Sequence, residues 1–119
     1  MCILVVEDDE AIQEMVGTAL LFAGFDVVKA PDGSVALSLA DKFKPDLIYL
    51  DMHMPVMDGW DFLAVYRTSG RPEVPIIAVS AQYADKRPMP RVAAYLSKPF
   101  DLTRLVSTMN RLLDRYARV

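Results

Sequence analysis

The chain has 119 residues, of which 53% are hydrophobic and 24% charged, with one cysteine and a formal net charge of −3. These values are typical of a globular protein with a core of its own, so we expect one domain over residues 1–119. No apolar run approaches the roughly 20 residues of a membrane span, and no basic leader precedes the first apolar run. We therefore expect a cytoplasmic protein without a membrane segment, and the single cysteine fits a reducing compartment.

Charge is distributed unevenly along the chain. Residues 1–85 carry 14 acidic and 5 basic side chains, whereas residues 86–119 carry 2 acidic and 8 basic ones. The acidic part should repel nucleic acid, so no direct nucleic-acid binding is expected. The basic C-terminal part is either a solvated helix face, the commoner origin of such a pattern, or a surface for self-association or a protein target.

Short apolar runs alternate with amphipathic segments, which predicts an α/β protein with a parallel sheet and helices on both faces. Each helix shows apolar residues at helical spacing, with Ser34 and Asp101 suited to capping two of them. The last helix has the clearest stripe: Leu102, Leu105, Val106, Met109, Leu112, Leu113 and Tyr116. The predicted strands are 2–6, 25–30, 47–51, 74–80 and 94–98, and the predicted helices are 10–23, 34–44, 59–69 and 102–116.

The crossover between the fourth and fifth strands is irregular. It contains Pro88 and Pro90, and proline removes a hydrogen-bond donor and disfavours helix in the residue before it. At most one or two helical turns fit, around residues 82–86. We therefore predict a shortened or irregular fourth helix in the segment 82–93.

Charged and hydroxyl side chains follow four of the predicted strands. Asp8 and Asp9 follow the first strand, and Asp51 ends the third. Ser80 ends the fourth, and Lys98 ends the fifth. Because the carboxyl ends of parallel strands share one sheet edge, where open α/β sheets bind ligands, we expect these residues to form one site.

The chemistry of this set points to Mg²⁺ and a phosphoryl group. Asp8, Asp9 and Asp51 supply several hard oxygen ligands but fewer than a complete cage, which suits a metal that keeps waters and shares a phosphate. Asp51 is the best candidate nucleophile because the strand end fixes it. Lys98 can pair with one phosphoryl oxygen and the hydroxyl of Ser80 can donate to another.

These motifs resemble the receiver domain of two-component response regulators. The resemblance covers essentially the whole chain and rests on Val6-Glu7-Asp8-Asp9, on residues 51–59 (Asp-Met-His-Met-Pro-Val-Met-Asp-Gly), on Val79-Ser80-Ala81 and on residues 95–100 (Tyr-Leu-Ser-Lys-Pro-Phe). It implies a flavodoxin-like (βα)5 fold with a five-stranded parallel sheet in the order 2-1-3-4-5.

The resemblance also implies roles for individual residues. Asp51 would accept phosphate from a histidine kinase or histidine phosphotransfer protein, and Asp8 and Asp9 would hold Mg²⁺ with the main-chain carbonyl of His53. Ser80 and Tyr95 would form the conformational switch. The chain would thus be a signalling switch in a phosphorelay rather than primarily an enzyme, although self-phosphorylation and self-dephosphorylation are expected.

Two residues are candidates for tuning the site from its rim. The side chain of His53 is expected at the rim of the pocket rather than on the metal, and Gln82 lies two residues beyond Ser80. The proline-broken segment 82–93 departs from the family pattern, so we expect the output face to be modified, or the chain simply to relay phosphate.

Three other classes of protein share parts of this pattern. An aspartate-nucleophile phosphatase of the haloacid dehalogenase type needs a second Asp two residues after the nucleophile, where this chain has His53. A flavodoxin-like FMN carrier needs a hydroxyl-rich phosphate loop where this chain has three acids after Val6. A degenerate receiver that binds partners without phosphate would not need the complete set of residues found here, namely Asp8, Asp9, Asp51, Ser80 and Lys98.

Overall fold

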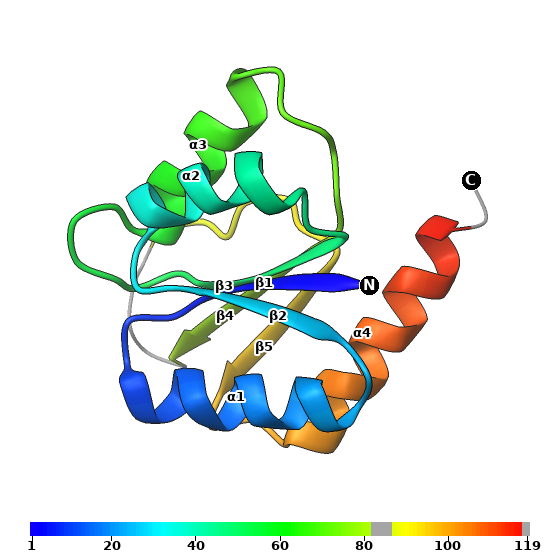
Figure 1. Ribbon diagram of the computed structural model, residues 1–119. Coiled ribbons are helices and arrows are strands. Elements are labelled where there is room, and N and C mark those ends of the chain that lie inside the picture. Colours follow the sequence, from blue (N-terminus) through cyan, green and yellow to red (C-terminus); the bar gives the residue numbers. More distant parts are fainter. Residues whose placement is uncertain (82–86, 118–119) are drawn as a thin grey trace.

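The computed structural model describes residues 1–81 and 87–117 and contains one five-stranded parallel sheet in the order β2-β1-β3-β4-β5, as predicted (Figure 1). Among these residues no helix is long and apolar enough to cross a membrane. The strands are β1 (Cys2–Val6), β2 (Asp26–Ala30), β3 (Leu47–Asp51), β4 (Ile76–Ala81) and β5 (Ala94–Lys98). The helices are α1 (Glu10–Phe22), α2 (Gly33–Phe43), α3 (Gly59–Thr68) and α4 (Leu102–Ala117).

The sheet lies between two layers of helices, with α1 and α4 on one face and α2 and α3 on the other (Figure 1). All five residues of β3 are buried, which explains its unbroken apolar run. Because side chains alternate across a strand, Leu47 and Tyr49 belong to the core under α1 and α4, whereas Ile48 and Leu50 belong to the core under α2 and α3. The central strand is thus packed on both faces, and this packing fixes the position of Asp51 at its end.

Aspartates cap the three helices that follow β1, β2 and β3. The carboxylates of Asp9, Asp32 and Asp58 each accept a hydrogen bond from a main-chain N–H in the first turn of the helix that follows. A cap of this kind satisfies a backbone donor that the helix leaves unpaired. Asp32 thus takes the role that the sequence suggested for Ser34, because α2 begins at Gly33, two residues earlier than a cap at Ser34 would place it.

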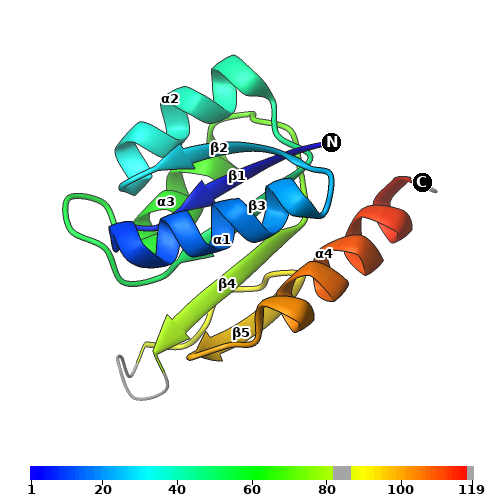
Figure 2. The same cartoon turned by 60° about the horizontal axis from the view of Figure 1, so that its bottom comes forward.

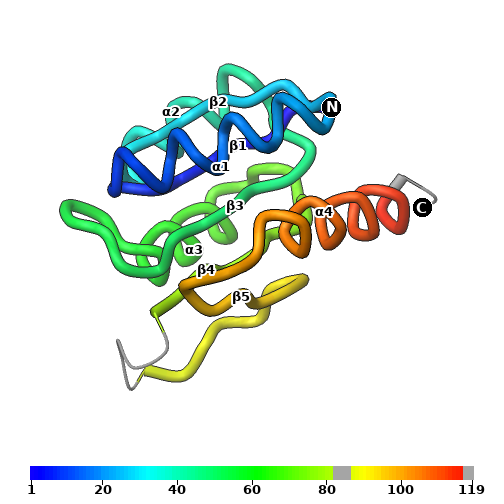
Figure 3. Tube along the Cα trace, turned by 90° about the horizontal axis from the view of Figure 1, so that it is seen from below, coloured from blue at the N-terminus to red at the C-terminus, as the bar shows by residue number. Residues whose placement is uncertain are grey.

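The connection between β4 and β5 differs most from the other crossovers. Residues 82–86, where the short helix was predicted, lie outside the described residues, and no helix forms in the described remainder 87–93. Pro88 and Pro90 account for this extended conformation. Val92 packs against the core under α2 and α3, so the segment runs back along that face of the sheet (Figures 2 and 3).

Three contacts made by Trp60 and Arg87 hold this connection against the start of α3. The indole N–H of Trp60 donates to the main-chain carbonyl of Pro88 at 3.1 Å, and the guanidinium of Arg87 lies 3.8 Å from the centre of the indole ring. Arg87 also forms an ion pair with Asp58 at 3.2 Å. Trp60 is therefore a packing residue, and it anchors the segment that replaces a regular helix.

Candidate functional site

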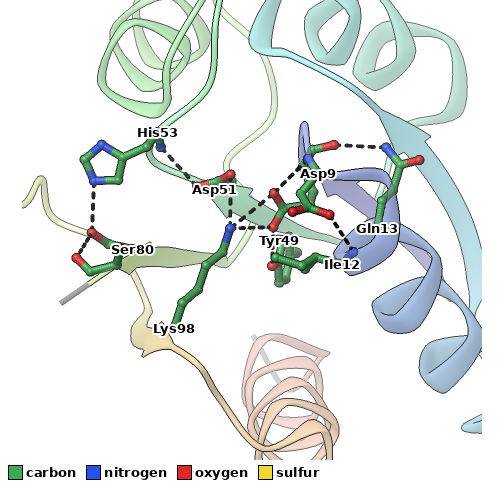
Figure 4. Close-up of polar contacts among 10 residues, drawn as sticks. Asp9, Ile12, Gln13, Tyr49, Asp51, His53, Ser80 and Lys98 are labelled. Atoms are coloured by element: carbon green, nitrogen blue, oxygen red, sulfur yellow. Dashed lines mark hydrogen bonds and ion pairs between the residues drawn. The ribbon is translucent and has the colours of Figure 1, made fainter. Parts of the chain in front are cut away.

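The carboxyl edge of the sheet brings the predicted site residues together. Asp51 ends β3, Ser80 lies near the end of β4, and Lys98 ends β5. The parallel register sets Asp51 beside Val79 and pairs Ala81 with Lys98, so the three side chains come from adjacent strands. Figure 4 shows the side chain of Lys98 reaching toward Asp51. Ser80 lies to the left of this pair and Asp9 to the right.

The ammonium of Lys98 lies between two buried carboxylates. Its Nζ is 2.9 Å from Oε1 of Glu7 and 3.3 Å from Oδ2 of Asp51. The phenol of Tyr49 donates a further hydrogen bond to Oε1 of Glu7 at 2.9 Å. Burial alone would lower the pKa of Lys98, but the hydrogen bond to Glu7 and the attraction of both carboxylates raise it, so the cation is kept.

Burial also shifts the pKa of the Asp51 carboxyl group. Desolvation and the neighbouring Glu7 raise its pKa to about 8, against the lowering effect of the main-chain N–H of His53 and of Lys98. The His53 N–H donates to Oδ1 of Asp51 at 3.0 Å, so one oxygen is held by the backbone and the other faces Lys98. The single ammonium of Lys98 therefore does not fully compensate the carboxylates of Glu7 and Asp51. The carboxyl edge of the sheet thus favours the binding of a further cation.

Carboxylate oxygens of Glu7, Asp8 and Asp51 lie within 4.8 Å of one another, so these three residues can share a metal ion. Asp8 is exposed while the other two are buried, which leaves one side of the set open to water. Hard carboxylate oxygens with room for water suit Mg²⁺. The donor set thus fits a divalent cation of this kind.

The cluster of Glu7, Asp8 and Asp51 differs from the predicted set of metal ligands at one residue. Asp9 was expected beside Asp8, but its carboxylate accepts the main-chain N–H of Ile12 at 3.1 Å and caps α1 (Figure 4). Glu7 takes its place because β1 ends at Val6, so the first acid after the strand lies at the sheet edge. The sequence carried this signal, since Glu7 directly follows the apolar run.

His53 connects Asp51 to Ser80. Nε2 of its imidazole lies 3.1 Å from the Ser80 hydroxyl, which itself donates to the main-chain carbonyl of Ala81 at 3.1 Å (Figure 4). A hydroxyl can both donate and accept, so Ser80 can contact Nε2 of His53 and the carbonyl of Ala81 at the same time. The imidazole also meets Trp60 edge-on, with ring centroids 5.3 Å apart, and so lies at the rim of the site.

Tyr95 lies on β5 with its ring 49% exposed and its hydroxyl donating to the main-chain carbonyl of Pro90 at 2.6 Å. It lines a cavity of about 440 Å³ together with Ser80, Trp60 and Met89. The two residues predicted as a switch therefore border one cavity beside the site. Gln82, the other predicted rim residue, lies outside the described residues.

A family model described as the response regulator receiver domain matches residues 3–110. The chain is 34% identical to the probable transcriptional regulatory protein TcrX of Mycobacterium tuberculosis, over 95% of the chain and 50% of that protein. It is 36% identical to the DNA-binding dual master transcriptional regulator RpaA of Synechocystis, over 98% of the chain and 51% of that protein. The chain spans about half the length of these relatives.

Solved structures agree with this match. The chemotaxis protein CheY4 of Vibrio cholerae has 32% sequence identity and a TM-score of 0.79, covering 93% of this chain and 97% of that one. The receiver domain of the Francisella response regulator 1452 has 29% identity and a TM-score of 0.85, covering 97% and 98%.

Fold, site and comparisons together define a signalling domain of two-component systems. The chain belongs to the response regulator receiver domain family. This places it with receivers rather than with phosphatases of the haloacid dehalogenase type or FMN carriers.

Proposed function

We propose that this chain is a phosphoacceptor in a phosphorelay, in which Asp51 receives a phosphoryl group from a histidine kinase or histidine phosphotransfer protein. The observation that carries the proposal is the placement of Asp51. It is buried at the end of the central strand, one oxygen is held by the His53 N–H, and Lys98 lies 3.3 Å from the other. A carboxylate attacking phosphorus needs such positioning and charge compensation more than it needs proton transfer.

In the proposed step, an oxygen of Asp51 forms a bond to phosphorus while the bond from phosphorus to the imidazole nitrogen of the donor breaks. The electron pair of that bond stays with the imidazole. Lys98 compensates the charge on a phosphoryl oxygen, because its ammonium already lies at this edge. The main-chain N–H of His53 keeps the carboxylate oriented for in-line attack.

Glu7, Asp8 and Asp51 would hold Mg²⁺, with the main-chain carbonyl of His53 as a further proposed ligand. When bound, the ion supplies positive charge for the phosphoryl oxygens. Binding of Mg²⁺ also requires Asp51 to be deprotonated. The ion would therefore compete with protonation of Asp51, which burial favours. Glu7 thus replaces Asp9 in the proposed set of ligands.

The proposed switch starts from the contacts that Ser80 and Tyr95 make in this structure. The Ser80 hydroxyl would leave Ala81 and His53 to donate to the new phosphoryl group, and Tyr95 would leave Pro90 to fill the cavity that both residues line. A local change of charge would thereby alter the surface formed by β5 and the connection before it. The signal would pass to a protein partner, and the exposed arginines of α4 offer such a partner a basic face.

Intact-mass measurement after incubation with acetyl phosphate tests the proposal. We expect one labile phosphoryl adduct that requires Mg²⁺ and is lost in Asp51→Asn. The control is Asp61→Asn, which removes an exposed carboxylate from α3 and should leave the adduct unchanged. Absence of an adduct in the parent protein, together with no binding of beryllofluoride, would contradict the proposal and favour a docking module that works without phosphate.

A further inference from the structure

A second cavity lies at the opposite edge of the sheet from Asp51. Its volume is about 550 Å³, and it is formed where β4 and β5 begin, at Ile76 and Ala93, beneath the end of α3. Strands of a parallel sheet start at one edge and finish at the other, so this cavity is separate from the site formed by Asp51 and Lys98. Figure 1 shows that the N-terminus lies at the same edge of the sheet, where the strands begin.

The cavity exists because no helix covers this part of the sheet in the described residues 87–93. The extended segment that runs there contributes Arg91 and Val92 to the lining. An extended chain covers less of a sheet than a helix does, so space remains between this segment and α3. A volume of this size is within the range of ordinary small-molecule sites, roughly 300–1,000 Å³.

Three arginines from different parts of the chain line the cavity. Arg67 comes from the last turn of α3, Arg71 from the loop after it, and Arg91 from the connection to β5. Glu73 is the one acidic residue in the lining. The chain as a whole is acidic, so a gathering of three guanidinium groups is a marked local reversal of charge. Like charges brought together repel one another unless an anion lies between them.

The three guanidinium groups differ in the hydrogen bonds and ion pairs that they already form within the protein. Arg71 forms a two-pronged ion pair with Asp41, at 2.8 and 2.9 Å, and Arg67 donates to the main-chain carbonyl of Arg91. The guanidinium of Arg91 has no hydrogen bond or ion pair with any residue in the described parts of the chain. It is exposed and lines the cavity, so its five donors are available to a ligand.

Tyr116 adds an aromatic surface to the basic lining. Tyr116 is 41% exposed although it belongs to the apolar stripe of α4, and it lines the cavity beside the arginines. Tyr66, the other tyrosine there, is buried, and its hydroxyl is used by the carbonyl of Pro72 at 2.6 Å. Tyr116 is thus the ring on which a planar group can stack.

We propose that this cavity binds a multiply charged phosphate anion of nucleotide size. Guanidinium groups bind phosphate oxygens in pairs, which a single ammonium cannot do, and the arginines supply this geometry from two sides. The phosphates would lie against Arg67 and Arg91, and the base would lie toward Tyr116. Binding would fix the segment around Val92 against α3 without using any residue of the Asp51 site.

Chemical-shift mapping of the backbone amides, in buffer with EDTA to exclude Mg²⁺, tests the proposal with two probes. Pyrophosphate tests the phosphate contacts alone, and adenosine triphosphate tests them together with stacking. We expect saturable shifts at residues 66–76 and 91–93 with both probes and tighter binding of the nucleotide. Saturation by the nucleotide alone, or shifts centred on Ser80 and Lys98, would overturn the proposal.

Matched variants complete the test. Arg91→Gln should weaken the binding of both probes about tenfold, as expected for a lost charge-assisted hydrogen bond. Arg111→Gln, an exposed arginine of α4 outside the cavity, should leave binding unchanged. Thermal unfolding verifies that both variants fold, and Tyr116→Ala should weaken the nucleotide but not pyrophosphate. Equal binding by the parent protein and Arg91→Gln would contradict the proposal.

Discussion

Glu7 is a fully buried carboxylate, and its three partners (Lys98, Tyr49 and the main-chain N–H of Asp9) explain how the fold tolerates it. An uncompensated charge in a protein interior is costly, and breaking a buried pair costs more than making it gains. Lys98 supplies the opposite charge, and the Tyr49 hydroxyl and the main-chain N–H of Asp9 each supply a hydrogen bond. Burial and the carboxylate of Glu7 raise the pKa of Tyr49 well above its usual range, so the phenol stays a donor.

Removing the Tyr49 hydroxyl tests the strength of this contact. We expect Tyr49→Phe to lower the free energy of unfolding by about 1.5–3 kcal/mol, because a charged acceptor loses its donor. Tyr66→Phe, which deletes a bond to the neutral carbonyl of Pro72, should cost about 0.5–1.5 kcal/mol. Urea unfolding measures both values, and equal losses would show that Glu7 keeps its charge without Tyr49.

The raised pKa of Asp51 predicts how stability depends on pH. Between the ordinary value of 3.8 and about 8, the folded protein binds more protons at this residue than the unfolded chain does. The contribution of Asp51 to stability is therefore present below the unfolded pKa and is lost as pH rises through the folded one. An asparagine in place of Asp51 does not titrate, so it makes no such pH-dependent contribution to stability.

We thus expect Asp51→Asn to gain stability relative to the parent protein as pH rises from 5 to 8.5, by about 1–3 kcal/mol in the presence of EDTA. Denaturant unfolding at both pH values measures this difference. Because Mg²⁺ favours the carboxylate, adding it should reduce the gain. A difference between the two proteins that does not change with pH would contradict the assigned direction.

At the scale of elements, the start of α3 is packed directly on the end of β3. The Gly59 N–H donates to the main-chain carbonyl of Met52 at 3.1 Å, and a Cβ on Gly59 would lie 2.7 Å from Cα of Met52 and 3.1 Å from the carbonyl oxygen of Asp51. No side chain fits there without moving backbone. The position of Asp51 therefore depends on a glycine eight residues later.

Gly59→Ala should lower the free energy of unfolding by about 1–3 kcal/mol, the usual range for overpacking, and should slow phosphorylation of Asp51. The control is Gly70→Ala, at φ +74° with open space around it, which should cost about 1 kcal/mol of backbone strain and leave phosphorylation unchanged. Chemical denaturation and the rate of adduct formation are the two measurements. An unchanged rate of phosphorylation in Gly59→Ala would show that the backbone at Asp51 and Met52 can shift to accommodate the methyl group without moving the Asp51 carboxylate.

The periodicity of α4 predicted its buried face but overstated how far along the helix that face is buried. Leu105, Met109, Leu112 and Leu113 are buried in the core under α1, as the stripe indicated. Tyr116 continues the same spacing but is largely exposed, since the sheet no longer lies beneath the end of the helix. Spacing thus identifies the face of a helix, whereas the extent of the partner surface decides where burial ends.

At the scale of the whole molecule, one tryptophan lies where the site meets the β4–β5 connection. Trp60 contacts the imidazole of His53 on one side and Arg87 and Pro88 on the other. If Ser80 leaves His53 when a phosphoryl group is present, this chain of contacts must change. Because Trp60 is the only tryptophan in the sequence, its fluorescence reports that change alone.

We expect beryllofluoride with Mg²⁺ to change the fluorescence of Trp60 in a saturable way. Asp51→Asn should show no change, since the analogue forms its bond to the carboxylate. His53→Ala should bind the analogue with a smaller change in fluorescence, because the link from Ser80 to Trp60 is removed. Identical responses in His53→Ala and the parent protein would show that the signal does not pass through the imidazole.

Much of this protein was determined by its sequence alone. Alternating apolar and amphipathic segments predicted the strands, the helices and both layers, because burial on two faces leaves a pattern that is local in the chain. The same pattern placed Asp51, Ser80 and Lys98 at strand ends, and a parallel sheet brings such ends together. Family membership followed from these motifs.

Only the tertiary structure decided which partners Glu7, Asp9 and His53 contact, and that a basic cavity forms at the far edge of the sheet. Glu7 and Lys98 are 91 residues apart, and Arg67 and Arg91 belong to different elements. Such contacts depend on where β1 ends and on how an extended segment lies across the sheet. Packing over long sequence separations fixes both features, and no local pattern of residues records it.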